Sequence, residues 1–257
     1  MRSIVLIAVS LFLLSGIGFA QTKPKPTSTV AAKTPSKTSV KPPAKTAAKV
    51  TTKPTATAEV TPIAKPSVDM GKVVGRTYTN ETFGFEVTFP DEWLIPDSDF
   101  EAYMKKQGFD LSLKAPDSLP VSTKTQVNKA IRRVNILLTA YRSMPGSADN
   151  AIVRISVEDL AANPQIEDAV DYFDAIRATY ATMKLPADFK YSETGAEKLG
   201  PNQFGYLDAD SNAGKKRMYA TVRNGYAIMF TISYKDDTDL NTLRLVLERA
   251  DMHLGKK

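Results

Sequence analysis

The spacing of hydrophobic and polar positions predicts a series of short β-strands from about Val73 onward. In residues 83–89, phenylalanine and valine alternate with Gly84, Glu86 and Thr88, which is typical of a strand buried on one face. Comparable patterns predict strands at 109–113, 134–141, 151–157, 203–208, 217–222 and 226–234. Asn224-Gly225 separates the last two strands and predicts a tight hairpin, because a type I′ turn requires positive φ at both central residues.

Other segments have the period of a helix. After Asn163-Pro164, which we interpret as a cap followed by a first-turn proline, the apolar residues of 166–183 fall on one helical stripe. A second amphipathic helix is expected from Thr238 to near Gly255, and Ser98-x-x-Glu101 has the spacing of a capping box before a short helix. Runs of strands with amphipathic helices between them predict an α+β domain, an antiparallel β-sheet covered by helices.

Two segments with different patterns precede this domain. Arg2, the apolar run 4–14 and the small-x-small end Gly18-Phe19-Ala20 predict a signal peptide over 1–20, with an uncleaved membrane anchor as the alternative. Residues 21–72 are rich in Lys, Pro, Thr and Ala, a composition that predicts a disordered linker. The folded domain is then expected over 73–257, and the protein is expected to be secreted or periplasmic.

The charge of the chain is concentrated in the linker. The whole chain has a formal net charge of +6. Residues 21–68 hold nine lysines and one acid, and residues 1–20 hold one arginine, so these two segments carry +8 and +1. The remaining residues therefore carry a net charge of −3, which argues against a nucleic-acid-binding domain. Two interpretations of the tether stay open: a solvated spacer, and a segment that binds an anionic envelope polymer.

Composition narrows the possible chemistry further. The chain has no Cys and a single His, His253, so thiolate catalysis, disulfides and Cys-ligated metals are excluded and a Ser-His-Asp relay is not expected. No glycine-rich phosphate loop or metalloprotease motif occurs. We therefore expect no cofactor and no enzymatic activity.

Two groups of residues remain as candidate binding sites. Asp208, Asp210 and Asn212 imitate the start of a calcium loop, but Ala213 replaces the required glycine and Tyr219 replaces the last acidic ligand. They are weak candidates for a metal site. The basic residues of one predicted hairpin could dock an anionic partner or could simply discourage pairing of sheet edges. They are Lys215, Lys216, Arg217 and Arg223.

A family resemblance is carried by the two ends of the domain. The segment Tyr78-Thr79-Asn80-Glu81-Thr82-Phe83-Gly84-Phe85-Glu86-Val87-Thr88-Phe89-Pro90-Asp91-Glu92-Trp93 resembles the opening motif of PsbP-like and DcrB-like proteins, an aromatic-rich strand followed by Pro-x-x-Trp. The apolar strand from Gly225-Tyr226 to Ser233-Tyr234, followed by a capped helix, is similar as well. The resemblance covers roughly residues 75–254. It implies an α/β/α sandwich and a largely non-enzymatic group of exported or partner-binding proteins.

The resemblance assigns no binding residue, because the matching positions are those that build the fold. PsbP attaches to the lumenal side of photosystem II, and the long Lys/Pro/Thr tether, which is not part of that pattern, argues against such a role here. We therefore expect an exported, non-catalytic accessory domain that binds an envelope protein, or an anionic polymer through the tether, with membrane contact only through an uncleaved signal. The alternative is a hydrolase acting on envelope glycan or peptide through an unrecognised carboxylate site, for which Asp91-Glu92 beside Trp93 is a weak candidate.

Overall fold

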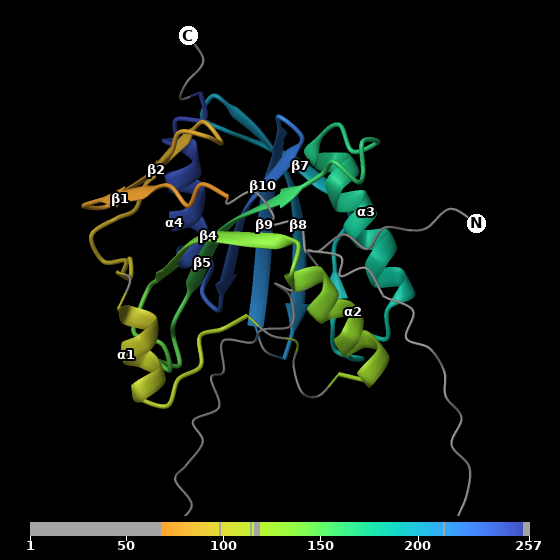
Figure 1. The fold of residues 1–257 in the computed structure, drawn as a ribbon, viewed down its shortest axis with the longest axis horizontal. Helices are drawn as coiled ribbons and strands as arrows, with labels where there is room; N and C mark the ends of the chain where they lie inside the picture. Colours follow the sequence, from red (N-terminus) through yellow and green to blue (C-terminus); the bar gives the residue numbers. More distant parts are fainter. Residues whose placement is uncertain (1–67, 98, 114, 116–118, 213, 254–257) are drawn as a thin grey trace, which may run out of the picture. The chain divides into compact units, whose positions relative to one another are not determined.

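The computed structural model describes residues 68–97, 99–113, 115, 119–212 and 214–253 (Figure 1). The expected signal peptide and nearly all of the expected linker lie outside these residues. The strands are β1 (Lys72–Val74), β2 (Thr77–Asn80), β3 (Phe85–Thr88), β4 (Val134–Tyr141), β5 (Ile152–Asp159), β6 (Lys190–Tyr191), β7 (Gly195–Leu199), β8 (Asn202–Ser211), β9 (Gly214–Arg223) and β10 (Tyr226–Tyr234). The helices are α1 (Phe100–Lys106), α2 (Val121–Ile131), α3 (Ala169–Thr182) and α4 (Asp237–Glu248).

The strands form two antiparallel sheets, which confirms the expected α+β class. The larger sheet has the order β4-β5-β10-β9-β8-β6, with β7 also paired to β8. The smaller sheet contains β1, β2 and β3 in sequence order. β10 is the most enclosed strand of the larger sheet, since it pairs along nearly its whole length with both β5 and β9.

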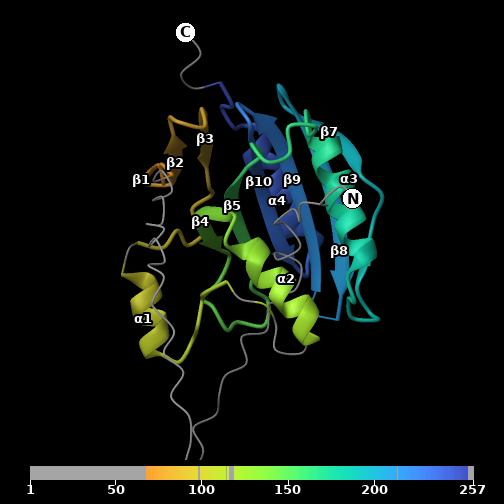
Figure 2. The ribbon, with the colours of Figure 1, turned by 45° about the vertical axis from the view of Figure 1, so that its right-hand side comes forward.

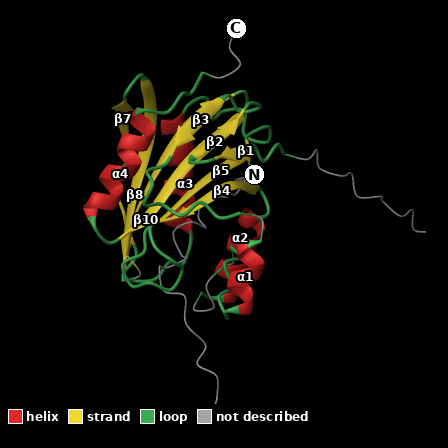
Figure 3. Ribbon diagram, turned by 90° about the vertical axis from the view of Figure 1, so that its left-hand side faces the viewer, coloured by secondary structure: helices red, strands yellow, loops and turns green. Residues whose placement is uncertain are grey.

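Helices cover both faces of the larger sheet (Figures 2 and 3). On one face, α4 and the smaller sheet pack against an aromatic-rich core in which Phe230 makes edge contacts with Phe85 and Phe204 at centroid distances of 5.6 and 6.1 Å. On the other face, α3 covers β8 and β9 and buries Phe173 and Ile176. Because successive strand residues point to opposite faces, each long strand contributes to both cores.

Turn and cap residues explain where several elements begin. Asn224 and Gly225 both have positive φ, 50° and 77°, so the expected hairpin turn between β9 and β10 is confirmed. The Asp236 carboxylate accepts the Thr238 amide at 2.8 Å and caps α4. The start of the earlier long helix was predicted wrongly: α3 begins at Ala169 and is capped by Asp168, which accepts the amides of Val170 and Asp171.

The segment between β3 and β4 departs most from expectation. The predicted strand at 109–113 is not present, and α2, which the sequence analysis did not predict, follows it. The short helix at 100–106 is confirmed, although its N-cap is Asp99, which makes no side-chain cap bond, and Ser98 lies outside the described residues. α2 buries Val127 and Ala130 in a small separate cluster with Leu119.

The folded part also begins earlier than the predicted boundary at Val73. Val68, the first described residue, already packs against the main core. Asp69 accepts the Gly71 amide at 2.8 Å and the Thr82 hydroxyl at 2.7 Å, and β1 starts at Lys72. The end of the predicted linker is therefore part of the domain. None of the helices in the described ranges combines the length and apolar character needed to cross a bilayer.

Candidate functional site: a cavity with a buried arginine

A strip of polar side chains crosses β4, β5 and β10 of the larger sheet. It lies on the same face as α3, beyond the part of that face that α3 covers. Arg154 on β5 stands directly opposite Thr139 on β4 and Thr231 on β10, and opposed residues of antiparallel strands share a face. Arg154 is only 7% exposed, and the buried Thr231 Oγ1 has no hydrogen-bond partner within the described part of the chain. Unsatisfied polar groups are uncommon in buried positions and call for an explanation.

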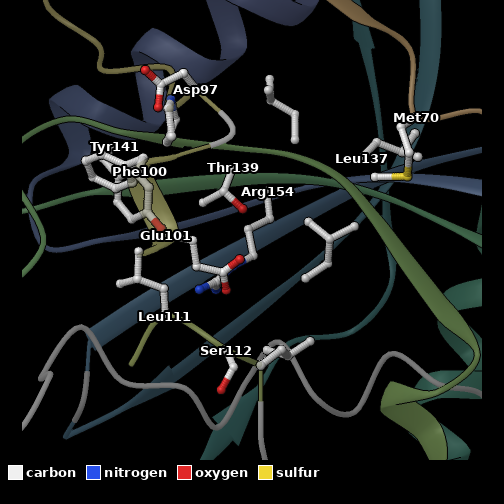
Figure 4. Close-up of a pocket in the computed structure, with 14 residues that line it drawn as sticks. Met70, Asp97, Phe100, Glu101, Leu111, Ser112, Leu137, Thr139, Tyr141 and Arg154 are labelled. Atoms are coloured by element: carbon white, nitrogen blue, oxygen red, sulfur yellow. The ribbon is translucent and has the colours of Figure 1, made fainter. Parts of the chain in front are cut away.

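Arg154 faces a cavity of about 430 Å³ (Figure 4). The sheet contributes β4 and β5 as the floor, and α1 with the segments on either side of it forms the opposite wall. The polar lining residues are Asp97, Glu101, Ser112, Thr139, Tyr141 and Arg154. The other lining residues are Met70, Pro96, Phe100, Leu111, Leu113, Ile136, Leu137 and Leu138, so apolar residues outnumber polar ones in the lining.

The Arg154 guanidinium forms no hydrogen bond or ion pair with another described residue, although carboxylates line the same cavity. Burial lowers the pKa of Arg154, and the nearby Tyr141 opposes that shift. A buried cation without a compensating anion is unfavourable, because the lost hydration is not replaced. The arrangement therefore favours the entry of an anionic group that brings its own oxygen atoms to the guanidinium.

Tyr141 links the buried cation to the acidic wall. Its ring packs on Phe100 of α1 at a centroid distance of 5.8 Å, which holds that helix against the end of β4. Burial raises the pKa of the Tyr141 hydroxyl; the charge of Arg154 opposes this shift and the charge of Glu101 adds to it. The hydroxyl is therefore within electrostatic reach of both charges, and it is one of the polar groups that line the cavity.

The four basic residues predicted as an anionic-partner patch do not form one free surface. Lys215 pairs with Asp237 at 3.1 Å, and Arg217 makes two 2.6 Å bonds to the Asp208 carboxylate, which raises the pKa of Arg217. Arg223 donates to the backbone carbonyls of Met252 and Gly84.

Lys216, the fourth member of that patch, points to the opposite face of β9. It is 5% exposed, and burial lowers its pKa well below the ordinary value, with Arg154 adding to the shift. Alternation along a strand separates consecutive residues in this way, so the contiguous basic sequence does not produce a contiguous basic surface.

The calcium candidates are engaged differently as well. β8 continues through Ser211, so Asp208 and Asp210 lie in a strand rather than in a loop. Both carboxylate oxygens of Asp208 are bonded to Arg217, and the backbone N–H of Asn212 donates to the Asp188 carboxylate at 2.9 Å. Within the described ranges, no group of three or more His, Cys, Asp or Glu residues is placed to hold a metal ion.

The carboxylates considered for hydrolysis lie away from the Arg154 cavity. Asp91 and Glu92 line an exposed groove with Leu245 and Arg249 of the α4 region. Trp93 is 1% exposed and belongs to the main core, so its ring is not available as a platform for a sugar.

Sequence reasoning did not single out Arg154. The alternation of Ile152, Arg154 and Ser156 with Val153, Ile155 and Val157 was visible in β5, and such a pattern ordinarily places the polar residues toward water. The available indication was that the apolar strand β4 precedes β5 and that Ile152 shares the face of Arg154, which makes a solvent-facing arginine less expected.

Comparisons with known proteins give similarities among solved structures and none at the level of sequence families. No family model matches the chain, and no curated protein matches its sequence. A solved structure of cyanobacterial PsbP (CyanoP) from Synechocystis sp. PCC 6803 is similar, with a TM-score of 0.38 and 12% identity over 70% of this chain and 96% of that chain. That structure is one of a PsbP protein, and the DcrB part of the resemblance is not shown. A similarity at this level assigns neither an activity nor a partner to the chain.

Proposed function

We propose that the chain is an exported, non-catalytic binding protein whose cavity accepts the anionic group of a ligand on Arg154. The observation that carries the proposal is a buried guanidinium that has no anionic partner among the described residues and faces a cavity of about 430 Å³. Cavities of several hundred cubic ångströms that combine apolar walls with a few polar groups are the usual form of small-ligand sites.

The lining favours a carboxylate over a phosphate. A guanidinium binds a carboxylate through two parallel N–H···O bonds, and a single unpaired cation matches a single negative charge. Asp97 and Glu101 lie on the wall opposite the sheet, and their charges repel a phosphate dianion more strongly than a carboxylate monoanion. The apolar residues of the wall suit a hydrocarbon body attached to that carboxylate.

Isothermal titration of the purified protein with hexanoate and with inorganic phosphate tests the proposal. Hexanoate is expected to bind with a dissociation constant of about 1 mM or below, as a small ligand of this size allows, and phosphate is expected to bind more weakly. Arg154→Met should weaken the binding of hexanoate at least tenfold. Lys105→Met removes an exposed charge from α1 outside the cavity lining and should leave the affinity for hexanoate unchanged. Equal hexanoate affinity in the wild type and in Arg154→Met would refute the proposal, and so would tighter binding of phosphate.

Export and the role of the tether are part of the same proposal. The pattern of residues 1–20 supports export through a signal peptide, and the nine lysines of 21–68 support attraction to an anionic envelope polymer. In this arrangement the tether localises the chain in the envelope and the domain binds the ligand.

A further inference from the structure

We infer that the ligand of this cavity is zwitterionic, with a carboxylate for Arg154 and an ammonium group for Glu101 and Asp97, joined by an apolar body. This inference rests on the proposed function and specifies the class of ligand. It follows from the way in which the cavity separates its charges, one buried cation on the sheet and two carboxylates on the opposite wall.

The two kinds of charge lie at different depths. Arg154 projects from β5 and is more than nine-tenths buried, whereas Glu101 on α1 and Asp97 just before it are exposed residues that also line the cavity. Figure 4 shows Glu101 reaching toward the region of Arg154 from its own helix. A ligand therefore meets the acidic rim first and the guanidinium last.

The charges do not neutralise each other within the protein. Neither Glu101 nor Asp97 forms an ion pair with Arg154, yet the Tyr141 hydroxyl is influenced by both Arg154 and Glu101. The unfilled volume is thus lined by opposite charges that form no ion pair with each other. An anion alone would gain from the guanidinium and lose to the acidic rim, and an ammonium group on the same ligand reverses that loss.

The wall between the charges selects the body of the ligand. Leu111, Leu137 and Phe100 are labelled around the charged groups in Figure 4, and they line the cavity with other apolar side chains. Such a wall favours methylene or ring carbons, which lose water on binding. The expected class is therefore an ω-amino carboxylic acid, or a larger molecule with that charge arrangement.

Titration at low salt with 6-aminohexanoate, hexanoate and hexylamine tests this inference. In the wild-type protein, 6-aminohexanoate should bind at least about fivefold more tightly than hexanoate, as expected for a partly enclosed charge contact. Hexylamine should bind more weakly than 6-aminohexanoate, because it cannot use Arg154. In the double variant Asp97→Asn with Glu101→Gln, the dissociation constants of 6-aminohexanoate and hexanoate should become about equal.

A matched control is available next to the rim. Asp99 is exposed, lies between Asp97 and Glu101 in the chain and does not line the cavity, so Asp99→Asn removes the same charge without removing a proposed contact. The preference should survive this change. Binding of hexanoate as tightly as 6-aminohexanoate in the wild type would overturn the inference and leave the proposed function intact. A preference that persists in the double variant would also overturn it, and failure of both carboxylates to bind would overturn both proposals.

Discussion

Replacing Arg154 with methionine should make the unliganded domain more stable and should at the same time weaken ligand binding. In the wild type, the guanidinium is buried without a partner in the described part of the chain and next to a polar strip that contains the unsatisfied Thr231 hydroxyl. Methionine keeps an unbranched apolar stem and eliminates the charge. The substitution therefore removes an unfavourable desolvation contribution from the folded state.

The expected magnitude follows from the surroundings of the side chain. A buried polar or charged group without a partner costs about 1–3 kcal/mol in mutational studies, and the atoms that Arg154→Met removes face a cavity that already exists. No new sealed void is created, so the usual cost of a truncated core residue is small here. We expect the free energy of unfolding to rise by about 1–3 kcal/mol, with Tm rising roughly 2–4 °C for each kcal/mol in a domain of this size.

Urea unfolding followed by tryptophan fluorescence measures this change directly. Trp93 is the only tryptophan in the chain and is 1% exposed in the folded domain, so its emission reports unfolding of the core. Arg154→Lys keeps a buried cation and should not produce the gain. A clear loss of stability in Arg154→Met would refute the reasoning, because it would mean that the guanidinium is satisfied within the folded protein.

Three other expectations concern the fold and the tether. Gly200→Ala should destabilise the domain by about 2 kcal/mol or more, because Gly200 has φ +57° and a Cβ would lie 2.1 Å from the Glu248 carbonyl oxygen. Gly108 has φ +86° but open space around it, so Gly108→Ala should destabilise the domain less. Equal decreases of the urea midpoint in the two variants would contradict this reasoning. Burial raises the pKa of three tyrosines to about 12: Tyr78, Tyr219 and Tyr234. Since they ionise near 10 when unfolded, the unfolded state holds fewer protons above pH ~10, and the urea midpoint should fall between pH ~10 and 12; a constant midpoint would be inconsistent with these shifts. Deleting residues 21–67 should leave the urea midpoint unchanged but abolish low-salt retention on a polyglutamate column, and unchanged retention would reject the binding role of the tether.

The elements that could be predicted are those whose own pattern decides their structure. β4 and β10 begin and end where the sequence indicated, because long β-branched and aromatic runs and the Asn224-Gly225 turn leave few alternatives. α2 has a weak pattern instead: its buried residues are Thr123, Val127 and Ala130, and polar residues occupy most other positions. Its position depends on a small cluster that also contains Leu119, and such tertiary contacts are not visible in a local window.

In the candidate site too, the local pattern predicts some features, whereas others depend on contacts between distant parts of the chain. The alternation in β5 places Arg154 on the face opposite Val153 and Ile155, but it does not say what covers that face. Burial of Arg154 results from the neighbouring strands and from α1 and its flanking segments, which are distant in sequence. The predicted basic hairpin failed in the opposite way. Its charges were obvious in the sequence, but Asp208, Asp237 and backbone carbonyls engage Lys215, Arg217 and Arg223 once the chain is folded.

The borders of the larger sheet have a consequence for crowded surroundings. Along one border, β6 has two residues and β7 has five, and both pair with β8 at separate positions. Along the other border, the register of β4 is irregular between Ile136 and Leu138, and the backbone of Leu94 forms an antiparallel bridge with that of Tyr141. A long, flat border would recruit strands from neighbouring molecules. Interrupted borders give only brief runs of free amides and carbonyls, so many copies can be concentrated in a small compartment without their sheets fusing.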